Sequence, residues 1–480
     1  MRAAIALTTL ASALAVSIWA CGGDDSTINP LGDGGNGSDG NANADTSSGQ
    51  DTSTAPDTST PCVGTDLRCK KVSCGGSVTT DLSGTVYDPA GKRTLYNVIV
   101  YVPNKTPDPL GAPGSCDRCG TVSGDPIVAA VTDANGNFTL KDVPAGASIP
   151  LVIQTGKWRR QVTVPTVSAC VDNVVDKTLT RLPAKASEGD MPSIAIASSC
   201  DPLECTLRKF GIDDTEFVAG AGMGTGHVHV YQQNNMGMLK VNGTATPAAT
   251  TLWATSELTK YDMLLNTCEC GPPTNKGAAY AAVQAFLDTG GRVLGNHYAY
   301  DFFAAPHGPA ETQAAAAWLA APMNVNSPDY IDQSFPKGKA FSDWLVGNLG
   351  GTAGQMNLTT TRNDVGGVKL ATSRYIFESN SPPDAGAAAS TKYLSFQAPV
   401  ESDAGTSLPA AQQCGRAGFA DFHAYGGFGG GPGNAAFPDT CNTLPTSMAD
   451  EEYAFEFIFF ELGTCIQDET MPPAPPSATP

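Results

Sequence analysis

The chain has 480 residues, with 28 lysine and arginine side chains against 47 aspartates and glutamates, so its formal net charge is -19 at pH 7. This balance argues against a surface that binds nucleic acid or anionic lipid by charge attraction. The length suffices for two or three domains with a sizeable hydrophobic core.

Residues 1–21 have the features of an export signal. After Arg2, Ala3–Ala20 is apolar and rich in small residues. It ends in Ile18-Trp19-Ala20-Cys21, followed by Gly-Gly-Asp-Asp, which resembles the lipobox of bacterial lipoproteins. The resemblance implies cleavage before Cys21, a diacylglycerol on its sulfur, attachment to the membrane through that lipid, and a place in the cell envelope at the outer membrane. An ordinary signal peptide or an uncleaved anchor is the alternative.

Polar, low-complexity segments flank the part expected to fold. Residues 22–61 are mostly Gly, Asn, Asp, Ser and Thr, which cannot bury enough apolar surface to offset the entropy lost on ordering. We therefore expect a disordered tether there. The proline-rich residues 466–480 are expected to form a frayed tail.

Fourteen cysteines in an exported chain indicate disulfides. If Cys21 carries the lipid, thirteen cysteines remain for pairing. Because thirteen is an odd number, at least one thiol is then free or intermolecular. Cys200 follows the predicted strand Ser193–Ala197, and Cys270 follows the predicted strand Met263–Thr267. If these strands are neighbours, the two cysteines fall within the Cα separation of roughly 4.4–6.8 Å that a disulfide needs.

Residues 62–185 predict an antiparallel β-sandwich, because short alternating runs are punctuated by Gly, Pro, Asp and Asn. Three segments are similar to the carboxypeptidase regulatory-like domain, a transthyretin-like sandwich of the carbohydrate-binding-like fold class: Leu82-Ser-Gly-Thr-Val-Tyr-Asp, Tyr96-Asn-Val-Ile-Val-Tyr-Val and Thr132-Asp-Ala-Asn-Gly-Asn-Phe. The resemblance implies a non-catalytic module for adhesion or spacing. The Asn135-Gly136 pair predicts a tight hairpin turn. Cys116-Asp-Arg-Cys119 fits a redox pair or half of a zinc site, but structural disulfides are the commoner use in such a domain.

Residues 190–465 alternate apolar strands with helices, which predicts an α/β domain. Tyr261–Thr267, Lys276–Thr289 and Gly290–Phe303 form one strand, helix and strand unit, and such a unit implies a parallel sheet. These segments look like the class I glutamine amidotransferase-like fold, in its trehalose-utilisation (ThuA-like) branch, and this resemblance implies that the domain is flavodoxin-like. Cys414-Gly-Arg-Ala-Gly-Phe-Ala-Asp-Phe-His423 looks like the late strand of that fold, which ends in a functional histidine.

Ligands of open parallel sheets bind beyond the carboxyl ends of the strands. In this chain those ends carry the candidate catalytic residues Glu269, His297 and His423. Residues of ligand-binding type lie near His297 and His423 in the sequence: Asn296, Tyr298, Asp301 and Asp421. We also expect His227 or His229 to reach into the same crevice from the preceding Gly-rich loop as a metal ligand.

Three functions stay open at this stage: a surface-binding protein, an enzyme and a purely structural envelope protein. Amidotransferase chemistry needs a cysteine on a strand-to-helix elbow, where this chain has Asn296-His297, so glutamine hydrolysis is doubtful. Cys268 and Cys270 are better explained as disulfide partners. The first hypothesis is a non-catalytic surface protein that binds a polysaccharide or another envelope component. The alternative is a hydrolase or other sugar-related enzyme at the sheet edge, with a divalent metal as the one cofactor considered.

Overall fold

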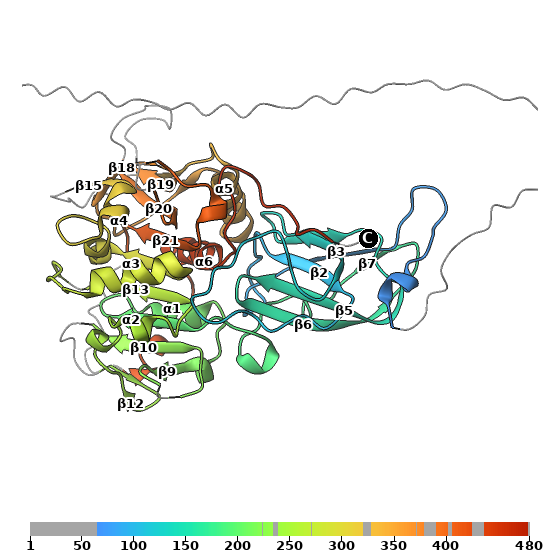
Figure 1. Cartoon of the computed structure of the whole chain (residues 1–480), viewed down its shortest axis with the longest axis horizontal. Helices are drawn as coiled ribbons and strands as arrows, with labels where there is room; N and C mark the ends of the chain where they lie inside the picture. Colours follow the sequence, from blue (N-terminus) through green and yellow to red (C-terminus); the bar gives the residue numbers. More distant parts are fainter. Residues whose placement is uncertain are drawn as a thin grey trace, which may run out of the picture. The chain divides into compact units, whose positions relative to one another are not determined.

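The computed structural model describes residues 65–222, 224–233, 239–269, 271–319, 328–370, 372–378, 390–401, 406–424 and 436–478. Residues from Pro61 to Pro480 form one compact unit. Its fold has several sheets and is mostly β, with some helices (Figure 1).

The first part is a β-sandwich, as the strand spacing predicted. One sheet has the order β4-β1-β7 and the other the order β3-β2-β5-β6. Neighbouring strands are antiparallel except for β1 and β7. The bounds are β1 (Asp81–Thr85), β2 (Ile99–Pro103), β3 (Pro126–Val131), β4 (Asn137–Leu140), β5 (Gly146–Thr155), β6 (Trp158–Val167) and β7 (Asp172–Val174), with short 3-10 turns η1 (Leu67–Lys70) and η2 (Ala186–Glu188). Fully buried Leu82, Val100 and Leu151 pack between the sheets.

The turn at Asn135-Gly136 differs from the expected hairpin. Gly136 has a φ of +75°, and a Cβ there would lie 2.8 Å from the Val86 carbonyl oxygen, so glycine is required. The strands on either side, however, belong to different sheets, because β4 pairs with β1. The turn therefore links the two layers of the sandwich.

The second part is built on one ten-stranded sheet of order β17-β16-β19-β20-β21-β14-β13-β8-β10-β9. The six strands from β21 to β9 are mutually parallel, and the other four pair antiparallel. The parallel strands are β8 (Ile194–Ser198), β9 (Phe217–Ala219), β10 (Val228–Gln232), β13 (Met263–Asn266), β14 (Arg292–Asn296) and β21 (Gly415–Ala420). The antiparallel strands are β16 (Asp329–Ile331), β17 (Gln355–Met356), β19 (Thr372–Glu378) and β20 (Thr391–Ala398).

Helices connect and cover this sheet. They are α1 (Leu203–Lys209), α2 (Thr255–Leu258), α3 (Ala279–Thr289), α4 (Ala310–Ala314), α5 (Pro336–Asn348) and α6 (Asp450–Leu462), with 3-10 turns η3 (Asp214–Glu216), η4 (Ala249–Thr251), η5 (His297–Phe302), η6 (Ala410–Gln412) and η7 (Cys441–Thr443). Small sheets are formed by β11 (Lys240–Val241), β12 (Thr244–Ala245) and β22 (Ala436–Phe437), and by β15 (Ala316–Trp318) and β18 (Val365–Val368). Within the described ranges, no helix has the length and apolarity needed to cross a membrane.

Four disulfides brace the fold, which confirms that prediction: Cys74–Cys170, Cys116–Cys414, Cys119–Cys465 and Cys205–Cys441. Both cysteines of the Cys116-Asp-Arg-Cys119 motif bond to distant residues, so the motif is structural. Cys69 and Cys200 are also disulfide-bonded. Cys270 lies outside the described residues, so the expected Cys200–Cys270 pair stays a prediction.

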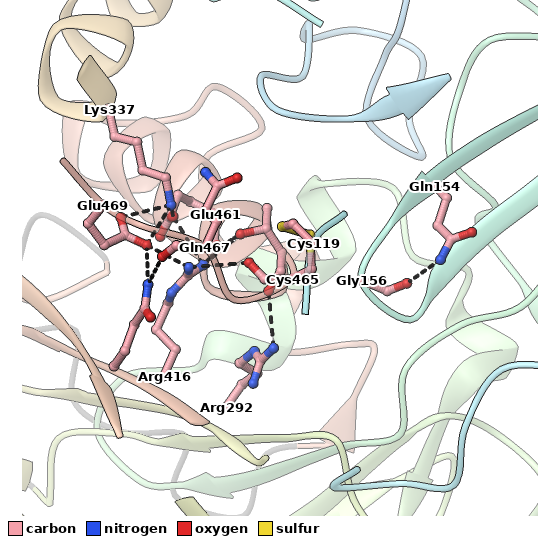
Figure 2. The surroundings of a disulfide bond; sticks show 12 residues. Cys119, Gln154, Gly156, Arg292, Lys337, Arg416, Glu461, Cys465, Gln467 and Glu469 are labelled. Atoms are coloured by element: carbon pink, nitrogen blue, oxygen red, sulfur yellow. Dashed lines mark hydrogen bonds and ion pairs between the residues drawn. A yellow bond between two sulfur atoms is a disulfide. The ribbon is translucent and has the colours of Figure 1, made fainter. Parts of the chain in front are cut away.

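A buried charge network lies beside the Cys119–Cys465 disulfide (Figure 2). The Arg416 guanidinium contacts Glu461 at 3.1 Å and Glu469 at 2.7 Å, and Lys337 Nζ lies 2.6 Å and 2.8 Å from the same two carboxylates. Breaking such a buried set by removing one partner typically costs about 3–5 kcal/mol. The network holds Glu469 against the sheet, so the chain is ordered beyond residue 466, where a frayed tail was expected.

Candidate functional site

Three side chains meet at the carboxyl edge of the parallel sheet. Cys268 follows β13, His297 follows β14 and His423 follows β21. The Cys268 sulfur and one ring nitrogen of each histidine all lie within 4.8 Å of one another, and all three residues are buried. The rings of His297 and His423 stack with their centroids 4.0 Å apart. The predicted convergence of these two histidines is therefore confirmed.

His297 stands at a sharp turn, where β14 passes directly into η5. Its φ is +49°, in the left-handed region that residues other than glycine seldom adopt. Such a conformation costs on the order of 1–3 kcal/mol and is found mainly where a functional side chain must be held. The turn aims the His297 ring at the neighbouring strand end, where its Nδ1 lies 3.1 Å from the Cys268 sulfur.

Cys268 is the free cysteine of the described residues, and its side chain is 1% exposed. The expectation that Cys268 forms a disulfide is corrected by this finding. Its sulfur contacts His297 Nδ1 and is not bonded to another cysteine. A free thiol agrees with the odd cysteine count that remains when Cys21 is set aside.

A carboxylate and an amide hold His423 in place. Asp201, which follows β8, accepts a hydrogen bond from His423 Nδ1 at 2.8 Å. The Asn296 amide donates to the same Asp201 oxygen and to the Phe422 carbonyl at 3.1 Å, while its own oxygen accepts the Cys268 N–H at 3.0 Å. Asn296 therefore ties three strand ends together. Because Asp201 binds Nδ1, Nε2 is the nitrogen of His423 left to act as a ligand atom.

Burial and neighbouring charges shift the pKa values of His297 and His423 in opposite directions. Burial, with repulsion from His423 and Arg362, lowers the pKa of His297 to about 2, so this ring is neutral at any ordinary pH. Burial alone would lower the pKa of His423 as well, but hydrogen bonds and charge attraction from Asp201 and Cys268 raise it to about 10. The site thus combines one neutral imidazole with one imidazole that holds its proton strongly.

Glu269 and Asp301 belong to a second network, which is centred on Lys276. Lys276 Nζ lies 2.6 Å from Glu269 and 3.9 Å from Asp301. Asp301 also accepts hydrogen bonds from the Tyr280 hydroxyl and from His307 Nδ1, the latter at 2.7 Å. Among the predicted catalytic residues, Glu269 is therefore at the expected edge, but its charge is matched by Lys276.

Tyr298 and Asp421 flank the cluster in different ways. The Tyr298 ring lies edge to face with His297, 4.7 Å between centroids, and beneath the Arg362 guanidinium at 4.4 Å. Asp421 accepts the Asp364 N–H at 2.6 Å. Burial and the nearby Asp364 carboxylate hold the pKa of Asp421 well above its usual range. Tyr298 is placed to contact a ligand of the cluster, whereas Asp421 faces the adjoining segment.

His227 and His229 are not brought to this site. They lie at the start of β10, which is the amino edge of the parallel sheet and opposite to the cluster. His227 Nδ1 contacts Glu216 at 2.8 Å, and His229 contacts the Tyr261 hydroxyl at 3.1 Å. The expectation that one of them reaches into the site is corrected, since His227 precedes β10, His229 is its second residue, and both have partners of their own.

Asp201, Cys268 and Arg362 belong to the site or its rim but were not among the predicted site residues. The rule that found His297 and His423 applies equally to Asp201 and Cys268, because each directly follows a parallel strand. Arg362 follows β17 in an antiparallel region, where that rule gives no signal.

Comparisons with known proteins do not identify a family. No family model matches the chain. No curated protein matches it either. A type II cohesin–X-dockerin complex from Acetivibrio cellulolyticus aligns at 19% identity with a TM-score of 0.15, over 29% of this chain and 74% of that chain. A 9R-lipoxygenase from Cyanothece aligns at 18% identity with a TM-score of 0.10, over 23% of this chain and 18% of that one. Scores this low carry no argument about fold or function.

Proposed function

We propose that this protein is an exported lipoprotein whose α/β part binds a transition-metal ion through Cys268, His297 and His423. The observation that carries the proposal is the convergence of one sulfur and two imidazoles within 4.8 Å, all buried and all at strand ends. Zinc and copper prefer thiolate and imidazole ligands, whereas magnesium and calcium prefer oxygen ligands.

The donor set fits such an ion once the metal displaces the Nε2 proton of His423, because a metal-bound imidazole must give up the proton on its ligand nitrogen. Ligand atoms of a tetrahedral zinc site lie roughly 3.3–3.8 Å apart, given bond lengths of about 2.0–2.3 Å. The observed separations, from 3.1 Å between Cys268 and His297 to at most 4.8 Å, bracket that range. Asp201 on the far nitrogen of His423 is the outer carboxylate that metal-bound histidines commonly have.

Three protein ligands leave a coordination position for water or a substrate oxygen, which a bound zinc ion would polarise. The protein's own contribution is to hold His297 neutral, to orient His423 through Asp201 and to bury the sulfur. We propose a binding role for this centre in the cell envelope, with metal-assisted hydrolysis as the alternative.

The assignment of the α/β part to the amidotransferase-like fold is also a proposal. Apart from the short edge strand β9, the parallel strands have the spatial order β10-β8-β13-β14-β21, which supports it because flavodoxin-like sheets have the order 2-1-3-4-5. His423 after β21 also supports it, whereas the elbow after β14 carries Asn296-His297 in place of the cysteine that the resemblance implies. Export is supported by the disulfides, which form in oxidising compartments. Lipidation at Cys21 rests on the lipobox-like sequence alone.

A thiol hydrolase is the second candidate, because Asp201, His423 and Cys268 stand in the order of an acid, base and nucleophile triad. The raised pKa of His423 favours it, since Cys268 contributes to that shift. The 1% exposure of Cys268 favours metal binding, because a nucleophile must reach its substrate.

Metal titration tests the proposal. The full-length chain carrying Cys21→Ser is stripped with a chelator and titrated with Co²⁺, whose thiolate complexes absorb strongly. We expect one ion per chain with a thiolate absorption band. Cys268→Ser should remove the band and His423→Gln should weaken binding, while His227→Gln is the matched control with unchanged binding. No binding, or binding that survives both cluster variants, would contradict the proposal.

A further inference from the structure

A cavity of about 530 Å³ lies beside the last turn of α1. The segment between β1 and β2 and the segment that begins at η7 form its other walls. Because α1 connects the parallel strands β8 and β9, its last turn lies toward the edge of the sheet where β9 begins. The cysteine and histidine cluster lies at the opposite, carboxyl edge. The volume falls within the range of about 300–1,000 Å³ typical of small-molecule sites.

Covalent and backbone contacts fix the walls of this cavity. Cys205 of α1 and Cys441 of η7 both line it and form a disulfide. The Ala90 N–H donates to the Phe210 carbonyl at 3.1 Å. Gly211 has a φ of +99°, and a Cβ there would lie 2.1 Å from the Ala90 nitrogen, so this close approach requires glycine. The cavity is therefore preformed, and a ligand would not have to order its walls.

The lining carries four cations and, among the described residues, no carboxylate: Lys92, Arg93, Arg208 and Lys209. This gathering contrasts with the whole chain, in which 47 acidic side chains outnumber 28 basic ones. Lys92 is exposed and has no ion-pair partner within the described ranges. The side chains of Arg208, Lys209 and Arg93 are 30%, 15% and 11% exposed. All four cations are therefore accessible at the cavity.

The acidic partners of Arg93 and Lys209 are buried and do not line the cavity. Arg93 contacts Asp88 at 2.7 Å and also contacts Glu456, and Lys209 contacts Glu452 at 2.6 Å. Burial raises the pKa of each of these three carboxyl groups. A carboxyl group with a raised pKa offsets a neighbouring cation less than an ordinary carboxylate does. The cavity is therefore a site of positive potential.

Arg208 presents a guanidinium that is held in one orientation. Its Nε and Nη2 donate to the two carboxylate oxygens of Asp214 at 2.6 Å and 3.0 Å, and its Nη1 donates to Asn442 Oδ1 at 2.8 Å. A guanidinium has five N–H groups, so two of them have no partner in the part of the chain that the structure describes. Such groups bind carboxylate and phosphate oxygens.

The remaining wall is partly apolar, with side chains from Ala90, Leu444, Pro445 and Met448. A ligand that fits the whole cavity thus combines an anionic group with an apolar portion. The formal charge of -19 repels large polyanions such as nucleic acid. A small anion is less affected, because salt screens distant charges beyond about 8 Å at physiological ionic strength.

We propose that this cavity binds a small organic anion, whose phosphate or carboxylate group is bound by Lys92 and Arg208 and whose apolar portion lies on Leu444 and Met448. The site is distinct from the metal centre, since the two lie at opposite edges of the sheet. It gives the protein a second binding function that does not require a metal ion.

Calorimetric titration of the chelator-treated, full-length Cys21→Ser chain at low ionic strength tests this. Phenyl phosphate and phenylacetate are the anionic probes, and 2-phenylethanol is the neutral probe of similar size. We expect saturable binding of at least one anion and none of 2-phenylethanol, with an affinity that falls as sodium chloride is added. Binding of phenyl phosphate alone would identify phosphate as the recognised group, and binding of phenylacetate alone would identify carboxylate.

Lys92→Glu should weaken anion binding about tenfold or more with an unchanged melting temperature, because this side chain has no ion pair to lose. Arg208→Gln should weaken it similarly, and its partly exposed pair with Asp214 contributes little to stability. The matched control is Lys105→Glu, which makes the same charge change at a lysine that is 74% exposed and does not line the cavity. It should bind like the parent chain.

The proposal is overturned if neither anion binds, or if 2-phenylethanol binds as tightly as the anions. It is also overturned if Lys92→Glu and Lys105→Glu lose the same affinity. Anion binding that persists in Cys268→Ser would show that the cavity works without the metal centre. Loss of anion binding in Cys268→Ser would place the anion on the metal centre and overturn the proposal.

Discussion

Asp201→Asn changes one charge at the candidate site while keeping its hydrogen bonds. The Asp201 oxygen that binds His423 also accepts the Asn296 amide, and the oxygen of an asparagine can accept both bonds. The substitution therefore removes the attraction that holds a proton on His423. It tests directly whether this histidine is charged in the folded protein.

The magnitude follows from the shift in the pKa of His423, from 6.5 to about 10. Each unit corresponds to about 1.36 kcal/mol, so the shift of about 3.5 units allows up to roughly 5 kcal/mol, shared between Asp201 and Cys268. Because the folded pKa lies above the unfolded one, this stabilisation is complete below about pH 6.5 and is lost as the pH rises through about 10. At pH 6.5, Asp201→Asn should lower the free energy of unfolding by roughly 2–3 kcal/mol, and the difference should fade toward pH 10.

Urea denaturation of chelator-treated protein at several pH values between 6 and 10 gives the free energy of unfolding for each variant. Subtracting the free energy of unfolding of Asp201→Asn from that of the parent chain at each pH cancels the titration of all groups that the two chains share. In a His423→Gln background, the same substitution should show no dependence on pH in this range. A difference that stays constant from pH 6.5 to pH 10 would refute the idea that Asp201 acts by charging His423.

Three further predictions concern anchoring, burial and bracing. Cys21→Ser should release the protein from membranes on fractionation, and retention in the membrane fraction would contradict lipidation there. Burial raises the pKa of Glu204 to about 7, so the free energy of unfolding should fall as the pH rises through 7. Denaturation experiments at pH 8 should find Glu204→Gln more stable than the parent chain by up to roughly 3 kcal/mol. Replacing Cys119 and Cys465 by serine should cost about 2–5 kcal/mol and lower the melting temperature, and an unchanged value would show that this bridge adds no stability.

The parallel unit around the site was predictable because its residues alternate clearly between buried strand and helix. The predicted strand Tyr261–Thr267 contains β13, and the predicted helix Lys276–Thr289 contains α3, which ends before Gly290 with its φ of +133°. Once the strands are parallel, their following residues must share an edge, and this brought His297 and His423 together.

Other features depend on three-dimensional contacts that sequence patterns do not reveal. The side chains of Glu269 and Cys268 leave the same strand end, yet only contacts in three dimensions show that Glu269 pairs with Lys276 and Cys268 with His297. The position of His227 was misjudged because a histidine at the amino end of a strand has the same sequence spacing as one at the carboxyl end. Disulfide partners hundreds of residues apart, such as Cys119 and Cys465, have no signature in their spacing.

X-ray absorption spectroscopy of the zinc-loaded, full-length Cys21→Ser chain tests the central proposal most directly. If Cys268, His297 and His423 hold the ion, the zinc shell contains one sulfur at about 2.3 Å and two imidazole nitrogens at about 2.0–2.1 Å, and Cys268→Ser removes the sulfur. A shell of oxygen and nitrogen alone in the parent chain would contradict the account.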